Sequence, residues 1–237
     1  MFIDVNISGN FARIYIENVV LICHGLPAEP GSVVEKSYDR LARYFSKYFN
    51  PVIFDFPGCG LSRGEFRLRR WVEDFVTIAD SFSAVDIVAF SMGGVPAVYA
   101  AANLRHVRSL TLVATPCCFE AISEDVLHQI YSNAKSRGTL KGVRDFGTFI
   151  RELKEDMIEF EPLKWIENIR NVLFIHGTKD DVIPIESSER MFRLAKNPKK
   201  FLRVVGGGHK LRQEKAVIDA IIQWIVEEKK KEGVEDL

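Results

Sequence analysis

The sequence predicts an α/β fold in which a mostly parallel sheet is covered by helices on both faces. Short, nearly continuous apolar runs recur along the chain, as they do in strands that are buried on both faces. Stretches of helical period lie between them, and this alternation is typical of parallel sheets. The 237 residues suit one large domain. The expected strands are 19–23, 51–54, 85–90, 110–113, 172–175 and 201–205, and the expected helices are 34–49, 68–83, 92–104, 186–196 and 211–229.

The N-terminal residues predict an additional antiparallel hairpin. Residues 2–7 and 11–16 alternate apolar and polar side chains around Ser8-Gly9-Asn10, which is the pattern of a hairpin with one solvated face. We expect this hairpin at the edge of the sheet, which would then contain eight strands.

One interval interrupts the alternation of strand and helix. Between Ala114 and Asn171 the apolar residues recur at helical spacing in two successive stretches. We therefore expect two amphipathic helices that form a small cap. In this interpretation residues 1–115 and 166–237 form the core, and residues 116–165 form the cap insertion.

Composition argues against several classes of protein. Lys and Arg number 32 and Asp and Glu number 32, so no net charge attracts a nucleic acid. The four cysteines form no C-x-x-C pair and no zinc-like spacing with histidine, and we expect neither a metal nor a cofactor. The N-terminus lacks a basic stretch before an apolar core, and no apolar run approaches the length of a membrane span. We expect a cytoplasmic protein, and the sequence leaves its oligomeric state open.

The clearest chemical signal is Ala89-Phe90-Ser91-Met92-Gly93, where an apolar strand ends and a helix begins. A serine hydroxyl becomes a useful nucleophile when it is exposed, held in place and given a base. A sharp turn from strand to helix exposes it, and the crowded backbone accepts only small side chains two residues away, such as Ala89 and Gly93. The following helix also directs free N–H groups toward any negative charge that develops there. The alternative is a glycine-rich connector in which the serine is incidental.

These residues resemble the α/β-hydrolase family, and the resemblance covers essentially the whole chain. The nucleophile motif of that family is G-x-S-x-G, from which Ala89 departs at the first glycine. Other stretches follow in the family's order, each just beyond an expected strand. They are His24-Gly25-Leu26, Asp55-Phe56-Pro57-Gly58-Cys59-Gly60-Leu61-Ser62, the stretch from His176-Gly177 through Asp180-Asp181 to Pro184, and Gly206-Gly207-Gly208-His209. The carboxyl ends of parallel strands meet at one edge of a sheet, so residues far apart in the chain can converge there.

The resemblance implies a catalytic triad of serine, aspartate and histidine. Ser91 is then the nucleophile, and His209 is the base that takes its proton and later protonates the leaving group. A carboxylate must hold the imidazole in the correct tautomer. The register of the motif favours Asp180 for this role, and an offset of one residue would assign it to Asp181.

The resemblance also assigns the oxyanion hole to the backbone N–H groups of Leu26 and Met92. We interpret His24 and His176 as structural histidines that hydrogen-bond the nearby backbone. The apolar faces of the cap could cover an acyl pocket, although such faces also serve plain packing. The expected substrate-binding residues are Gly25, Phe119, Phe146 and Phe149.

The function that this resemblance implies is a serine hydrolase that cleaves carboxylic esters through an acyl-enzyme. Its expected substrates are small-molecule esters with short to medium acyl chains, as for small carboxylesterases and monoacylglycerol-lipase-like members. Two alternatives remain open. One is an acyl thioesterase that acts on a phosphate-bearing thioester, and the other is a non-catalytic member that binds a small ligand.

Two basic clusters bear on the thioesterase alternative. They could lie at the rim of the site and favour an anionic substrate, or they could be ordinary solvated surface. Their members are Arg63, Arg67, Arg69 and Arg70 in the first cluster and Lys135, Arg137, Lys141 and Arg144 in the second.

Overall fold

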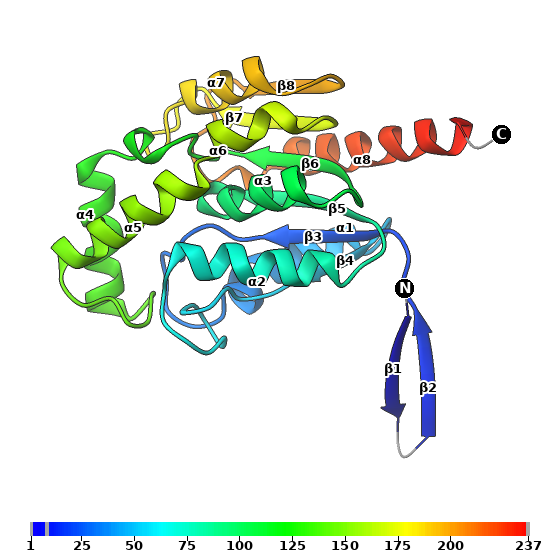
Figure 1. The fold of residues 1–237 in the computed structure, drawn as a ribbon, viewed down its shortest axis with the longest axis horizontal. Coiled ribbons are helices and arrows are strands. Elements are labelled where there is room, and N and C mark those ends of the chain that lie inside the picture. Colours follow the sequence, from blue (N-terminus) through cyan, green and yellow to red (C-terminus); the bar gives the residue numbers. More distant parts are fainter. Residues whose placement is uncertain (1, 8–9, 236–237) are drawn as a thin grey trace.

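A parallel sheet of six strands forms the centre of the computed structural model, which describes residues 2–7 and 10–235 (Figure 1). The strand order is β4-β3-β5-β6-β7-β8, and neighbouring strands are parallel throughout. These strands are β3 (Val19–Cys23), β4 (Asn50–Ile53), β5 (Val85–Phe90), β6 (Val107–Val113), β7 (Val172–Gly177) and β8 (Lys199–Val204). All six overlap the apolar runs that predicted them.

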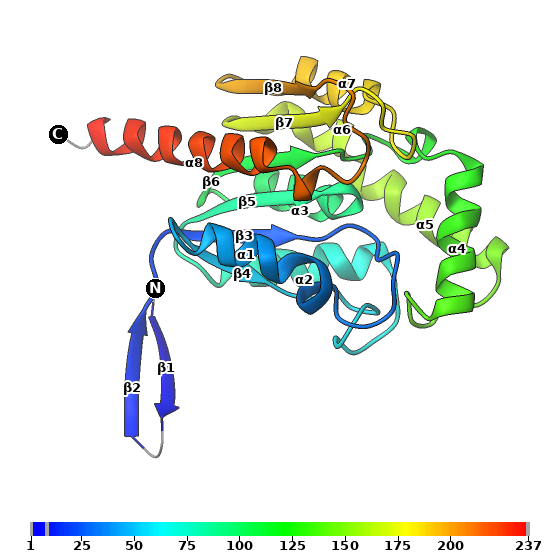
Figure 2. The same ribbon diagram turned by 180° about the vertical axis from the view of Figure 1, so that it is seen from behind.

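Helices cover both faces of this sheet (Figures 1 and 2). One face carries α2 (Leu68–Asp80), α3 (Gly94–Asn103) and α7 (Glu186–Leu194), and the other carries α1 (Asp39–Phe45) and α8 (Lys215–Glu235). Short turns precede three of these helices, namely the π-helical η1 (Val34–Tyr38) and the 3-10 helices η2 (Ser91–Gly93) and η5 (Leu211–Gln213). Of the helices in the described part of the chain, none is both long enough and apolar enough to cross a bilayer.

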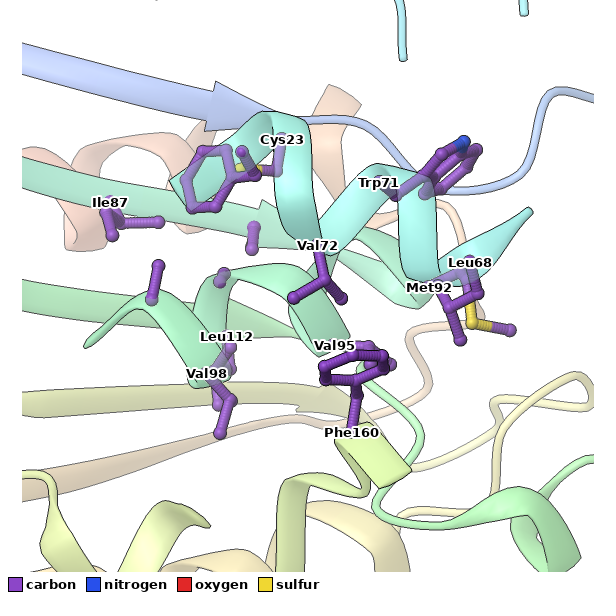
Figure 3. Close-up of a cluster of buried hydrophobic side chains, with 14 of the residues drawn as sticks. Cys23, Leu68, Trp71, Val72, Ile87, Met92, Val95, Val98, Leu112 and Phe160 are labelled. Carbon is purple, nitrogen blue, oxygen red and sulfur yellow. The ribbon is translucent and has the colours of Figure 1, made fainter. Parts of the chain in front are cut away.

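Successive residues of the central strands face two different cores. In β3, Leu21 and Cys23 pack in the core under α2 and α3, whereas Val20 and Ile22 pack in the core under α1 and α8. Figure 3 shows part of the first core, to which α3 contributes Val95. Because both faces of the sheet are covered, the sequence of the strand is a continuous apolar run and does not alternate between apolar and polar residues.

The N-terminal hairpin does not join the central sheet. β1 (Phe2–Ile7) and β2 (Asn10–Tyr15) pair antiparallel with each other and form a separate two-stranded sheet. Within the described ranges the main sheet therefore has six strands and not the eight expected. The chain turns at Asn18, which adopts a left-handed backbone conformation (φ 54°), and the hairpin lies away from the sheet (Figure 1). The expected turn residues Ser8 and Gly9 lie outside the described residues.

Three helices lie between β6 and β7, where the sequence predicted two. They and the short 3-10 turns beside them are η3 (Phe119–Ala121), α4 (Glu124–Arg137), α5 (Phe146–Phe160), α6 (Pro162–Trp165) and η4 (Ile166–Asn168). The side chain of Ser123 caps the start of α4, and Gly138 ends it in a left-handed conformation (φ 65°). In both views α4 and α5 lie beyond the ends toward which the strands point, which is the edge that carries the predicted site (Figures 1 and 2).

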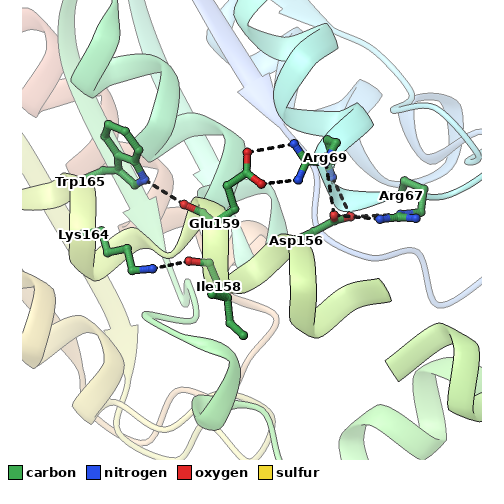
Figure 4. A network of polar contacts seen from close by, with 7 residues as sticks. All are labelled: Arg67, Arg69, Asp156, Ile158, Glu159, Lys164 and Trp165. Atoms are coloured by element: carbon green, nitrogen blue, oxygen red, sulfur yellow. Dashed lines mark hydrogen bonds and ion pairs between the residues drawn. The ribbon is translucent and has the colours of Figure 1, made fainter. Parts of the chain in front are cut away.

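A polar network joins α5 to the start of α2 (Figure 4). Asp156, whose side chain is 1% exposed, accepts hydrogen bonds from Arg67 Nη2 at 2.9 Å and from the backbone N–H of Arg69 at 3.1 Å. Arg69 also pairs with the exposed Glu159. The buried carboxylate of Asp156 therefore anchors the inserted segment to the core.

Candidate active site

Ser91 lies at the sharp turn between β5 and α3. Its φ of 51° falls in the left-handed region, which residues other than glycine rarely adopt. The turn leaves little room, because a Cβ on Gly93 would lie 2.4 Å from the carbonyl oxygen of His24. Ala89 is fully buried on the strand side. The small side chains at 89 and 93 therefore allow the chain to reverse and to present Ser91 Oγ at the carboxyl edge of the sheet.

His209 lies between Ser91 and Asp180. Its Nε2 is 3.0 Å from Ser91 Oγ, and its Nδ1 is 2.8 Å from Asp180 Oδ2. Because an ionised carboxylate only accepts hydrogen bonds, Nδ1 carries the hydrogen and Nε2 can accept that of the serine hydroxyl. Asp181, the other candidate carboxylate, is exposed to solvent. The hydrogen-bond partner of His209 is thus the residue that the motif register favoured.

Hydrogen bonds keep Asp180 ionised although its side chain is fully buried. Its Oδ1 accepts from the backbone N–H groups of Val182 and Ile183, both at 2.9 Å. Burial raises the pKa of Asp180, but hydrogen bonds from His176, His209 and the backbone outweigh burial and hold the pKa well below its usual value. A negative charge therefore stands next to the His209 ring at neutral pH.

Backbone contacts fasten the loop that carries His209 to the end of β7. Lys179 N–H donates to the carbonyl oxygen of Gly207 at 2.9 Å, and Gly206 N–H donates to Thr178 Oγ1 at 2.9 Å. Asp180 follows directly on this segment. The loop after β8 is thereby held beside the carboxylate that its histidine contacts.

Gly25 brings the loop after β3 against Ser91. A Cβ at this position would lie 2.8 Å from Ser91 Cβ and 3.3 Å from Ser91 Oγ. The next residue, Leu26, and the residue after the serine, Met92, both line the cavity around Ser91. The two residues expected to supply oxyanion donors therefore line the same cavity as the serine, Leu26 on the loop after β3 and Met92 in η2.

Both neighbouring histidines are buried behind this surface. His24 Nδ1–H donates to the carbonyl oxygen of Gly25 at 2.6 Å, and His24 Nε2 accepts the backbone N–H of Phe56 at 3.0 Å. Burial lowers the pKa of His24 to about 4, so its ring is neutral at pH 7. His176 is also fully buried, but its Nε2 lies 3.2 Å from Asp180 Oδ2. The sequence interpretation of His176 as a backbone-binding residue missed this contact.

A cavity of about 490 Å³ surrounds Ser91 and His209. One wall is formed by Ile122 and, at successive turns of α4, by Val126 and Ile130. These residues belong to the helical pattern that was visible in the sequence. The cavity therefore places apolar side chains of the inserted segment opposite the serine hydroxyl.

The three phenylalanines expected to bind substrate are not among the residues that line this cavity. Phe149 is buried in the main core, and Phe146 stacks on His128 with ring centroids 3.8 Å apart. The ring of Phe119 faces Lys154, whose Nζ lies 5.7 Å from its centroid. These side chains pack the inserted helices together. Helical spacing indicated that they were buried, but it did not indicate which neighbour would cover them.

The basic clusters at 63–70 and 135–144 do not line the cavity either. Arg67 and Arg69 pair with Asp156, and Lys141 Nζ donates to two backbone carbonyl groups of the loop before α2 at 2.8 and 2.7 Å. Of the two interpretations that the sequence left open, a place at the rim of the site is therefore not borne out. Arg67, Arg69 and Lys141 instead connect the segment between β6 and β7 to the loop before α2 and to the start of α2.

The sequence analysis did not single out several lining residues, including Arg212 and Tyr38. Arg212 lies three residues after His209, and this proximity is the signal that could have identified it. Tyr38 comes from the π-helical turn Val34–Tyr38, and no local motif marks it. Among the described residues, no group of three or more His, Cys, Asp or Glu side chains could hold a metal ion.

Comparison with known proteins agrees with the architecture. A sequence model of the alpha/beta hydrolase family matches residues 19–220, which includes all six strands of the main sheet. The chain belongs to the alpha/beta hydrolase family. The matched range also contains Ser91, Asp180 and His209.

Relatives of this alpha/beta hydrolase are distant. The uncharacterized protein YqkD of Bacillus subtilis is 25% identical over 210 residues, which cover 84% of this chain and 67% of that protein. The monoacylglycerol lipase of Paleococcus ferrophilus is 18% identical with a TM-score of 0.68, covering 89% of this chain and 94% of the lipase. A lipase-esterase related protein of Clostridium acetobutylicum is also 18% identical with a TM-score of 0.68, covering 94% and 98%. At these identities the structural likeness shows a shared fold.

Proposed function

We propose that this alpha/beta hydrolase cleaves carboxylic esters of small molecules, with Ser91 as the nucleophile. The observation that carries the proposal is the 3.0 Å distance from Ser91 Oγ to His209 Nε2, on an imidazole whose other nitrogen is held by an ionised carboxylate. A serine in this setting has a base within hydrogen-bond reach, and the base has a fixed tautomer.

The reaction divides into two steps. His209 Nε2 takes the proton as Ser91 Oγ attacks the carbonyl carbon, and the imidazolium then protonates the departing alcohol. Water attacks the acyl-enzyme with the same base and restores the serine. Asp180 stabilises the imidazolium in both steps through its contact with Nδ1.

Backbone N–H groups of Leu26 and Met92 are proposed to stabilise the developing oxyanion. Both residues line the cavity, and Gly25 brings the loop of Leu26 within contact distance of Ser91. Main-chain donors suit this role because they are rigid and always carry their hydrogen.

The inserted segment, residues 116–165, is proposed to form a cap over the cavity. Residues 1–115 and 166–237 then form the core. The cap's apolar stripe of Ile122, Val126 and Ile130 faces the cavity and would contact the acyl chain. A volume of about 490 Å³ lies within the ordinary range for small-molecule sites and favours short to medium acyl chains.

The test is a series of p-nitrophenyl esters from acetate to decanoate, run beside acyl thioesters and amides of the same chain lengths. We expect the esters to be hydrolysed, with the highest kcat/KM at short or medium length. Ser91→Ala should lower kcat by at least about 10³-fold, leaving only catalysis by the remaining groups. Ser132→Ala, at an exposed position of α4, is the matched control.

A fluorophosphonate should label the wild-type chain at Ser91 and leave Ser91→Ala unlabelled. Full activity in Ser91→Ala would exclude this nucleophile. If the folded wild-type chain turns over no substrate of the series, the alternative is favoured in which this chain is a non-catalytic family member that binds a small ligand. A preference for thioesters would mean that the bond cleaved is that of a thioester, and Ser91 would remain the proposed nucleophile.

A further inference from the structure

The lining of the cavity around Ser91 is chemically mixed. Ile122, Val126 and Ile130 form an apolar stripe, although α4 also contributes the polar Gln129 and Asn133. The charged members of the lining outside the His209–Asp180 pair are Glu29, Lys210 and Arg212. Their formal charges sum to one positive charge. A purely aliphatic ester would use the apolar stripe and leave these charges without a partner.

Arg212 is connected to the reacting serine through aromatic rings. Its guanidinium carbon lies 5.4 Å from the centroid of the Tyr38 ring, and this ring lies 5.6 Å from that of Phe90 in an edge arrangement. Phe90 directly precedes Ser91, and all four residues line the same cavity. The contact with the ring therefore holds the guanidinium against Tyr38 in the lining of the cavity that contains Ser91.

The positive charge of Arg212 has no carboxylate partner within the described part of the chain. Other arginines do, since Arg108 pairs with Asp86 at 2.5 Å and Arg203 pairs with Glu189 at 3.1 Å. The Nε atom of Arg212 is buried and makes no hydrogen bond to the described residues. Because this atom is shielded from solvent, an anion in the cavity would pair with the other guanidinium N–H groups and offset the uncompensated positive charge.

The other lining residues leave the charge of Arg212 unpaired. Glu29 is the one carboxylate in the lining, it is exposed, and it forms no ion pair with Arg212 in the described part of the chain. Tyr38 is a neutral phenol at pH 7, because burial raises its pKa to about 12. Its ring can contact the guanidinium by its π face, which leaves the N–H groups of Arg212 for a ligand.

We propose that Arg212 binds a carboxylate of the substrate, so that the natural substrate is an ester that also carries one free carboxylate. This inference rests on the proposed hydrolysis at Ser91 and specifies its substrate class. The guanidinium offers parallel N–H donors that match a carboxylate. A single net positive charge in the lining suits a monoanion better than a phosphate dianion. The carboxylate can belong to the acyl half, as in a half-ester of a dicarboxylic acid, or to the alcohol half, as in an ester of a hydroxy acid.

Two matched pairs of substrates distinguish a carboxylate on the acyl half from a carboxylate on the alcohol half. The acyl pair is p-nitrophenyl hydrogen glutarate and p-nitrophenyl pentanoate, and the alcohol pair is carboxymethyl butyrate and ethyl butyrate. The quantity measured is the ratio of kcat/KM for the anionic ester to kcat/KM for the neutral ester. This ratio does not depend on the fraction of folded enzyme, because both substrates are measured on one preparation.

Arg212→Gln should lower this ratio roughly 10- to 100-fold in one of the two pairs, which is the effect of losing a charge-assisted hydrogen bond. Arg212→Lys, which keeps the charge and loses the planar donor pair, should give an intermediate ratio. Arg137→Gln is the control, because it removes a positive charge from an exposed end of α4 that does not line the cavity, and it should keep the wild-type ratio.

An unchanged ratio in both pairs for Arg212→Gln would overturn the proposal, as would an equal drop in Arg137→Gln. A larger effect of Arg212→Gln on a phosphate-bearing ester than on either carboxylate would overturn the assignment of a carboxylate. These outcomes are separate from the failure of the proposed function. That failure would appear as unchanged turnover of neutral esters by Ser91→Ala.

Discussion

His176 and Asp180 are in direct contact, with His176 Nε2 3.2 Å from Asp180 Oδ2, the same oxygen that accepts His209 Nδ1–H at 2.8 Å. His176 Nε2 also lies 2.9 Å from the carbonyl oxygen of Ile183, and its Nδ1 lies 2.7 Å from Ser188 Oγ. Because a carbonyl oxygen only accepts, Nε2 carries the hydrogen and Ser188 donates to Nδ1. His176 is therefore a positioning residue that contacts the same carboxylate oxygen as His209.

Replacing His176 should affect the base through Asp180. His176→Ala removes one hydrogen bond to the carboxylate, so Asp180 is held less firmly against His209 Nδ1. We expect kcat to fall about tenfold with KM little changed. His176→Gln, whose amide can donate toward Asp180, should restore part of the loss. A loss that His176→Gln does not restore would show a packing role alone.

The adjacent aspartates offer a matched pair of variants. Asp180→Asn places an amide against His209 Nδ1 and favours the wrong tautomer, so kcat should fall by about three to four powers of ten. Asp181→Asn makes the same chemical change at an exposed position and should stay within about twofold of the wild type. Steady-state kinetics on one p-nitrophenyl ester compare the two. Similar losses in both variants, or a greater loss in Asp181→Asn, would contradict the assignment of the acid.

Ser91, Asp180 and His209 could be located from the sequence because each follows a buried parallel strand, and such strands end at one edge of the sheet. Between the adjacent aspartates, however, the sequence could indicate only a register. In the structure that choice depends on the turn after β7, where Oδ1 of Asp180 accepts two backbone N–H groups. The conformation of a short turn is set by contacts of this kind, which the order of residue types does not reveal.

Contacts between distant segments were beyond the reach of the sequence. Arg67 was grouped with its neighbouring arginines, but its partner Asp156 lies 89 positions away. The apolar faces of the two inserted helices were visible as helical periods. These periods could not show that Ile130 of α4 would line the cavity that contains Ser91, whereas Phe146 of α5 would stack on His128. Arg212 was missed for the same reason, because its significance comes from its contact with Tyr38, which lies far away in the sequence.

Asp156 should contribute strongly to stability. Its buried carboxylate accepts hydrogen bonds from the Arg67 side chain and from the backbone N–H of Arg69, so Asp156→Asn removes the buried charge and one of the two acceptor oxygens that serve these donors. We expect the free energy of unfolding in urea to fall by roughly 2–4 kcal/mol. The control is Glu159→Gln, which breaks the more exposed pair with Arg69 and should cost under about 1 kcal/mol. Equal losses in the two variants would show that burial of Asp156 adds nothing to its ion pair.

His24 should make the stability of the fold depend on pH. Burial lowers its pKa from 6.5 to about 4, so the unfolded chain binds this proton more readily than the folded chain. The unfolded state therefore gains protons as the pH falls from 6.5 toward 4, and the free energy of unfolding must decrease over that window. The shift corresponds to a loss of roughly 3 kcal/mol by pH 4.

Urea unfolding at several values between pH 7 and pH 4 measures this slope in the wild type and in His24→Asn. The variant should be less stable at pH 7, because the N–H of Phe56 loses its acceptor, but its stability should decline less toward pH 4. Parallel curves for the two chains would assign the acid sensitivity to other groups. A shallower curve for His24→Asn would show that the fold keeps this imidazole neutral, because the variant lacks the group that takes up a proton on unfolding in that window.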